Sequence, residues 1–228
     1  MISLEGGLRR RQRISFKAAP AASGPAFRAA SSTSTVTGTP GNYGFTIPIP
    51  TGTVAGDVLV AQVWIRSDSK AGTLGTAPAG WTQRGTFDTT YFTIGWKTYS
   101  RIATGTDSFV WTGGDYWEDM TAAMISVSGG TAVDVVGPGG NSALTAVAPS
   151  VTTTTSPTLL VGLFSVLENA IAAPASMTSR VNITKNNGYG GNSQVIATEA
   201  LAASGATGTR TCPTSSLNVR YSQLIAVK

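Results

Sequence analysis

The chain contains no histidine and a single cysteine, Cys212, among its 228 residues. Histidine is the commonest general base and the commonest metal ligand in proteins, so its absence removes the usual basis for acid–base catalysis and for a zinc site. One cysteine can form neither an internal disulfide nor a thiolate cluster. We therefore expect a chain without a metal, a cofactor or a disulfide framework.

Long apolar runs are also missing. No stretch approaches the roughly 20 apolar residues that a membrane-spanning helix needs. The basic N-terminus is not followed by the apolar segment of a secretory signal. The sequence thus predicts no membrane association and folding in a cytoplasm.

Charged residues are scarce and unevenly placed. They make up 12% of the chain, about half the usual share. Residues 1–35 carry six basic side chains against Glu5, a net charge of +5, whereas residues 36–228 carry ten charges of each sign. The positive charge therefore belongs to the N-terminal segment, and a nucleic-acid-binding surface on the neutral remainder is disfavoured.

Two apolar segments of similar pattern lie about a hundred residues apart, VAGDVLVAQVWI at 54–65 and SPTLLVGLFSVL at 156–167. Each is a run of about eight strand-prone residues that follows a turn dipeptide. Both segments predict central strands.

The sequence around these two segments repeats in the same order. PAGWTQR at 78–84 returns as PASMTSR at 174–180, ATGT at 103–106 returns at 206–209, and AMISV at 123–127 returns as QLIAV at 223–227. Together with the apolar segments these are four matches in one order. They predict two related halves, at about 45–128 and 143–228.

The rest of the pattern consists of short strands separated by turns, with a Gly/Pro hinge at 137–140 and no convincing helix. Trp81 follows a Pro-Ala-Gly turn and is predicted to enter the rim of the core. We predict an all-β protein, a jelly-roll-like two-sheet β-sandwich over residues 36–228 built from two pseudo-repeated halves.

Residues 1–35 are predicted to form a basic, extended anchoring arm and linker. Residues 18–39 are mostly small or polar and form a linker or an extended segment laid over another surface. The basic cluster could add an edge strand to another chain while its arginines meet carboxylates or phosphates. A disordered basic tail and contact with nucleic acid are the alternatives. The residues assigned to the anchor are Arg9, Arg10, Arg11, Arg13, Ile14, Phe16 and Lys17.

The exposed-looking loop at 113–119 combines acidic and aromatic residues. Asp115, Glu118 and Asp119 could hold a Ca²⁺ ion or serve glycoside hydrolysis, and a solvated loop that keeps an edge from aggregating is the alternative. Tyr116 and Trp117 could contact a glycan or a protein, with a place in the core as the alternative. No serine-hydrolase motif is present, so we predict a protein that is not an enzyme.

An ordered set of segments resembles β-sandwich proteins of tailed-bacteriophage virions. The set comprises GDVLVAQVWI at 56–65, PAGWT at 78–82, a strand containing Trp96, FVWT at 109–112 and APSVTTT at 148–154. Such proteins are structural: head decorations, head fibres, collar or minor tail components, often with a terminal arm that docks on the shell or tail. The resemblance implies a virion location, capsid or tail subunits as partners, and homo-oligomers.

Three functions follow as hypotheses. The first is a structural virion component anchored by residues 1–35. The second is a carbohydrate-binding module of a tail or head fibre that recognises a host surface glycan through Tyr116 and Trp117. The third is a polysaccharide-degrading tail protein that uses Asp115 and Glu118.

Overall fold

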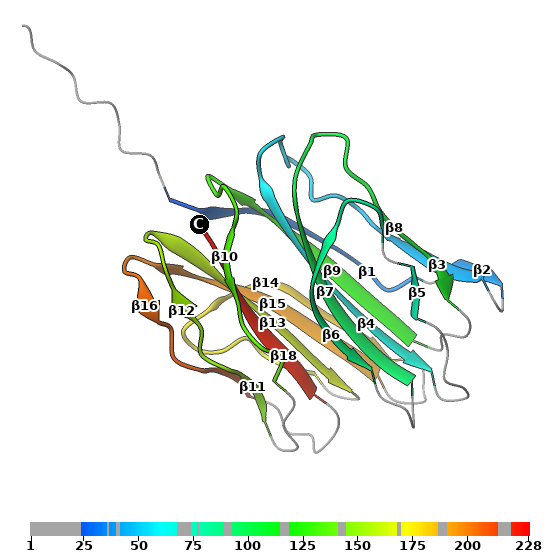
Figure 1. Cartoon of the computed structure of the whole chain (residues 1–228). Coiled ribbons are helices and arrows are strands. Elements are labelled where there is room, and N and C mark those ends of the chain that lie inside the picture. Colours follow the sequence, from blue (N-terminus) through cyan, green and yellow to red (C-terminus); the bar gives the residue numbers. More distant parts are fainter. Residues whose placement is uncertain are drawn as a thin grey trace, which may run out of the picture.

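The computed structural model describes residues 24–228 except 36, 40–41, 68–73, 77, 89–92, 115–118, 141–144, 168–169, 187–190 and 214–219. Every regular element among these residues is a strand, and every strand pair is antiparallel (Figure 1). The described residues include no helix that is long and apolar enough to cross a membrane. The predicted all-β sandwich is therefore confirmed.

Two five-stranded sheets form the centre of the molecule. The first sheet has the order β1–β9–β4–β7–β6 and the second has the order β10–β18–β13–β15–β14. The first comprises β1 (Ala26–Thr33), β9 (Asp119–Ser128), β4 (Val58–Ser67), β7 (Thr93–Ile102) and β6 (Thr82–Asp88). The second comprises β10 (Val133–Val136), β18 (Arg220–Val227), β13 (Thr158–Leu167), β15 (Gly191–Leu201) and β14 (Thr178–Asn186).

The two sheets have the same strand order when each strand is replaced by its counterpart in the other half. The first sheet comes from the first half of the chain and the second sheet from the second half. The predicted central strands are β4 and β13, and each is the third of five strands. The duplication inferred from the sequence is thus present as duplicated topology.

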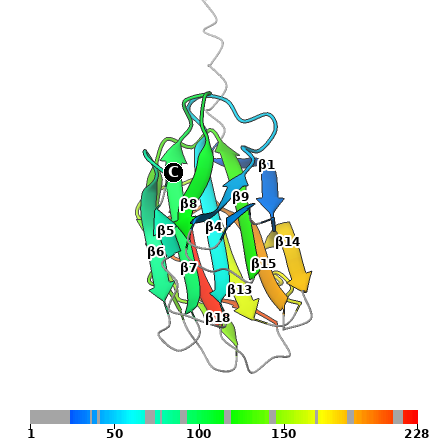
Figure 2. The ribbon, with the colours of Figure 1, turned by 90° about the vertical axis from the view of Figure 1, so that its right-hand side faces the viewer.

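The inner core lies between the two sheets, which run along the same long axis of the molecule (Figure 2). Alternate residues of each strand point into it, as the two-residue period of a strand requires. From β4 these are Val58, Val60 and Trp64, and from β13 they are Leu159, Val161 and Leu163.

The opposite face of each central sheet is also covered. The first sheet is covered by a four-stranded sheet of order β2–β3–β8–β5, and the second by two two-stranded ladders, β11–β17 and β12–β16. The covering strands are β2 (Thr37–Thr39), β3 (Asn42–Ile47), β8 (Phe109–Gly114), β5 (Leu74–Thr76), β11 (Ala146–Ala148), β17 (Arg210–Cys212), β12 (Thr152–Thr153) and β16 (Gly205–Ala206). The sandwich has these outer layers because both faces of its central strands are apolar and need burial.

Polar side chains join the two central sheets across the inner core. Gln62 Nε2 donates to Ser165 Oγ, Trp64 Nε1 donates to Asn192 Oδ1 at 2.8 Å, and Thr98 Oγ1 donates to Gln223 Oε1 at 2.7 Å. A buried donor that loses its partner costs about 1–3 kcal/mol. These bonds therefore favour one alignment of the two halves.

The structure differs from the sequence reading at the N-terminal boundary. Residues 26–33, which the sequence predicts as part of the arm and linker, form edge strand β1 of the first sheet and pair with β9. Phe27 packs against the inner core, and the Arg28 guanidinium meets the Asp57 carboxylate with Nε 2.7 Å from Oδ2. A segment of small residues is held here because it completes the exposed edge of β9.

Candidate functional site

The residues predicted for partner and glycan contacts lie outside the described part of the chain. The prediction of an anchoring arm and that of a glycan- or protein-binding loop therefore stay predictions. The residues concerned are Arg9, Arg10, Arg11, Arg13, Ile14, Phe16, Lys17, Asp115, Tyr116, Trp117 and Glu118.

Asp119 belongs to the described part, and for this residue the prediction of an exposed loop is wrong. It is the first residue of β9, it is 1% exposed, and it lies opposite the buried Arg66 in the β4–β9 ladder. Its register with β4 places it inside the sandwich. Among the described residues, no group of three or more His, Cys, Asp or Glu side chains could hold a metal ion.

Trp81 and Cys212 are both core residues. Trp81 is 8% exposed, as predicted for the core rim, and its Nε1 donates to Ser108 O at 3.0 Å. Burial raises the pKa of the Cys212 thiol to about 12. A thiolate nucleophile at neutral pH is therefore not available from this residue.

The edge strands of both central sheets carry charged residues at β-bulges. The register shifts at Arg28 in β1, Arg84 in β6, Asp134 in β10 and Arg180 in β14. A bulge inserts one extra residue and re-aims its side chain. The same device thus recurs at equivalent positions of the two halves.

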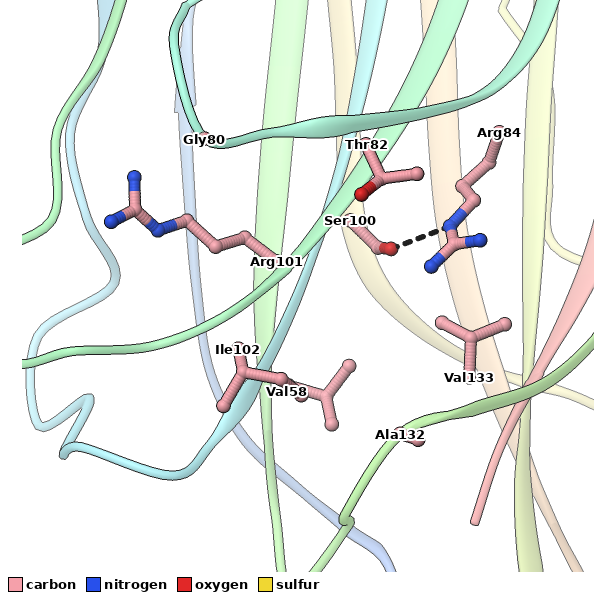
Figure 3. Close-up of a pocket in the computed structure, with 9 residues that line it drawn as sticks. All are labelled: Val58, Gly80, Thr82, Arg84, Ser100, Arg101, Ile102, Ala132 and Val133. Atoms are coloured by element: carbon pink, nitrogen blue, oxygen red, sulfur yellow. Dashed lines mark hydrogen bonds between the residues drawn. The ribbon is translucent and has the colours of Figure 1, made fainter.

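Arg84 lines a cleft of about 320 Å³ between β6 and β7 of the first sheet and the start of β10, here called the β6 cleft. Its Nε donates to Ser100 Oγ at 2.7 Å, and Figure 3 shows the guanidinium lying between Ser100 and Val133. Burial lowers the pKa of Arg84, because desolvation disfavours the charged form. The lining is Val58, Gly80, Thr82, Arg84, Ser100, Arg101, Ile102, Ala132 and Val133.

Arg101 is the second cation of the β6 cleft and is already paired. Its Nε lies 2.8 Å from Asp107 Oδ1, and its Nη1 donates to Ala79 O at 3.4 Å. Gly80 has a φ of 80°, and a Cβ at this position would lie 2.9 Å from Arg101 Nη1. The turn therefore favours glycine through its backbone conformation, and Arg101 packs closely against it.

The second half contains a corresponding cleft of about 420 Å³, here called the β14 cleft. Arg180 Nε donates to Thr198 Oγ1 at 2.8 Å, which repeats the bond from Arg84 to Ser100. The guanidinium carbon of Arg180 lies 4.2 Å from the centre of the Phe27 ring. The lining is Pro25, Ala26, Phe27, Leu159, Ser176, Thr178, Arg180, Thr198, Glu199 and Ala200.

The two clefts differ in charge. Arg101 in the β6 cleft corresponds to Glu199 in the β14 cleft, and Glu199 is bound by Arg210 through Nε–Oε2 at 2.8 Å and Nη2–Oε1 at 3.1 Å. No acidic residue lines the β6 cleft among the described residues. This cleft therefore offers guanidinium and hydroxyl groups over an apolar floor, which suits binding of an anion.

Both arginines were visible in the sequence as the last residue of the repeated PAGWTQR and PASMTSR segments, but nothing there indicated a cleft. A bulge can be recognised only from the pairing of a strand with its partner. That pairing depends on contacts between residues that are far apart in the sequence. Repetition of an arginine at one position was the only signal.

No protein-family model, curated protein or solved structure matches the chain.

Proposed function

We propose that this chain is a non-enzymatic structural component of a phage virion. Its N-terminal segment attaches it to neighbouring capsid or tail subunits, and its β-sandwich is displayed on the particle surface. The all-β body agrees with the fold implied by the resemblance to virion proteins. The proposal rests on one contrast. The edge strands of the sandwich are unsuited to pairing with another chain, whereas the segment that precedes β1 is basic.

The edges of both central sheets are unsuited to pairing with another chain. Each of the edge strands β1, β6, β10 and β14 has a bulge with a charged residue. Bulges and charges on edge strands prevent the addition of further strands. We therefore assign attachment to other subunits to a part of the chain outside these edge strands.

The segment before β1 supplies that element. Residues 1–23 carry five basic side chains and one acidic side chain, a net charge of +4. The described chain begins at Gly24, which lies against the Pro157 ring, at the end of the sandwich where the C-terminus also lies (Figure 1). An arm that leaves from one end of a rigid body can engage a symmetric lattice, where repeated contacts add avidity.

The test replaces residues 1–23 with a Gly/Ser segment of equal length in a particle-producing host. We expect the variant to be absent from purified particles, while circular dichroism and thermal unfolding of the purified chain remain unchanged. Deletion of residues 1–35 is unsuitable because it removes β1.

Replacement of residues 18–23 alone is the matched control, because it keeps the basic cluster, and this variant should still be incorporated. The proposal fails if particles never contain the wild-type chain. It also fails if the Gly/Ser variant is incorporated as efficiently as the wild type.

A further inference from the structure

The β6 and β14 clefts are equivalent in the fold, but only the β14 cleft has its arginine covered by the chain itself. Phe27 from β1 stacks on the Arg180 guanidinium. Val133 lies on the opposing wall of the β6 cleft and provides no ring for Arg84. Within the described residues no carboxylate pairs with Arg84. The arginine of the β14 cleft therefore has a ring of its own chain as a partner, whereas Arg84 has neither a ring nor a carboxylate among the described residues.

Arg84 is held in a fixed orientation by its neighbours. The bulge directs the side chain inward, and the bond from Nε to Ser100 Oγ restrains one edge of the guanidinium. The planar guanidinium carries five N–H donors in a fork that matches a carboxylate. Desolvation of a cation without an anion is unfavourable, and the lowered pKa of Arg84 reflects this cost.

The floor of the β6 cleft indicates which anion would bind. Val58 and Ile102 are apolar, as is Val133 on the opposing wall, and Thr82 adds a hydroxyl opposite Ser100 (Figure 3). An inorganic phosphate could also bond to the guanidinium, but it would lose hydration over the apolar floor without covering it, whereas an aliphatic chain would cover the floor. A carboxylate on a short methylene stem fits both the cation and the floor.

We propose that the β6 cleft binds a carboxylate with an aliphatic stem, such as a glutamate side chain of a partner or a free dicarboxylate, with Arg84 as the anion-binding residue. This inference goes beyond the proposed virion function and does not depend on it. Asp134 follows Val133 in β10, but its Oδ2 accepts from Thr154 N at 2.7 Å and its Oδ1 accepts from Thr154 Oγ1. This carboxylate is therefore engaged elsewhere.

The test is a titration of the full chain, labelled with ¹⁵N, with glutarate at constant ionic strength. The Arg84 Nε–Hε resonance should shift and saturate, with a Kd on the order of 1 mM for a single charge-assisted contact. The Arg180 Nε–Hε resonance serves as an internal reference and should not move, because Phe27 covers that guanidinium and Glu199 lines its cleft. Inorganic phosphate should bind at least about tenfold more weakly, which is 1.4 kcal/mol.

The variant Arg84→Gln should weaken glutarate binding at least about tenfold. Arg180→Gln is the matched control, because it removes the same type of arginine–hydroxyl bond from the equivalent bulge, and it should leave the affinity unchanged. Saturation in wild type with loss in Arg84→Gln supports the site. A glutamate-containing peptide that binds more tightly than glutarate would identify a protein partner as the source of the carboxylate.

Shifts that do not saturate, equal effects of phosphate and glutarate, or wild-type affinity in Arg84→Gln would each overturn the proposal. If Arg84→Gln does not fold, Arg84→Lys replaces it. Lysine keeps the charge but lacks the fork, so the affinity for glutarate should fall below that of the wild type while the resonances of Thr82 and Ser100 still shift. Unchanged resonances at both residues in wild type would also overturn it.

Discussion

The two halves of this molecule share a scaffold but fill it differently. Strand order and the positions of the edge bulges coincide. In the outer core of the first half, Phe45 faces Trp111 across the β3–β8 ladder, whereas the corresponding β11–β17 ladder pairs Ala146 with Cys212. Backbone pairing has therefore persisted while side-chain volume has changed.

Volume missing from the outer strands of the second half is supplied by its central sheet. Phe164 of β13 is fully buried in that outer core. Gly162 leaves room for its ring, since a Cβ there would lie 2.6 Å from Phe164 Cε2. A core at native density tolerates such an exchange only when total volume is maintained.

Charges have changed in the same compensated way. Arg101 pairs with Asp107 in the first half, and the equivalent pair is Glu199 with Arg210, with the signs exchanged. At the bulges, Arg28 in β1 meets Asp57 before β4, whereas Asp134 in β10 meets Thr154 before β13. In the first comparison the contact is kept with the signs exchanged, and in the second the charged partner of the edge-strand residue is replaced by the neutral Thr154.

The largest expected effect comes from Trp111→Ala in the aromatic outer core. Trp111 is fully buried, with ring centroids 5.7 Å from Phe45 and 5.6 Å from Tyr99. Its truncation should lower the free energy of unfolding by about 3–5 kcal/mol, because the cavity cannot close between two sheets. Urea unfolding followed by circular dichroism measures this loss.

Cys212→Ala is the comparison in the outer core of the second half. It removes one sulfur atom and should cost roughly 1 kcal/mol, the value of one buried methylene-sized group. Equal losses in the two variants would contradict the idea that the two outer cores depend on side chains of different size.

A smaller, pH-dependent effect is expected for Asp57→Asn. Burial opposes ionisation of Asp57, but hydrogen bonds from Val54 N at 3.1 Å, from Arg28 and from Ser126 Oγ at 2.8 Å outweigh it and lower its pKa below 3.8. A carboxyl with a lowered folded-state pKa stabilises the fold above its unfolded value and loses that contribution as pH falls through the folded pKa. Asp57→Asn should therefore cost about 2 kcal/mol at pH 7.

Unfolding free energies between pH 2 and pH 7 check the sign of this effect. The difference between wild type and Asp57→Asn should shrink as the pH drops below about 4, the unfolded value. Asp134→Asn is the comparison in the second half, where contacts with Thr154 and Lys228 likewise lower the pKa against the effect of burial. A difference for Asp57→Asn that stays constant with pH would show that the lost contribution is not ionic.

The sequence was informative where the pattern was local. The apolar runs predicted β4 and β13, and the repeated segments predicted two halves. Leu59 and Ala61 alternate with Val58 and Val60, so the apolar character of both faces already required an outer layer, although only two sheets were predicted. β1 was missed because its residues are small, and its place depends on the open edge of β9, which is distant in sequence.

The smallest expected effect comes from the double variant Arg101→Glu, Asp107→Arg. This variant gives the pair of the first half the order of charges found in the second half, so it is the sharpest test of the exchanged charges. The Arg101 side chain is 23% exposed, so Arg101→Glu alone should cost about 0.5–1 kcal/mol through loss of the pair, and Asp107→Arg alone should cost more, because the Asp107 side chain is buried and has further bonds. The double variant should recover the pair but not all stability, because Asp107 Oδ2 also accepts from Thr104 N at 2.7 Å and Gly105 N at 3.1 Å, whereas Arg210 donates to carbonyls of its own turn.

A double-mutant cycle by urea unfolding isolates the pairing energy, which should shrink at 1 M salt. The same exchange at Glu199 and Arg210 is the control, and strictly additive losses in both halves would mean that neither pair stabilises the fold.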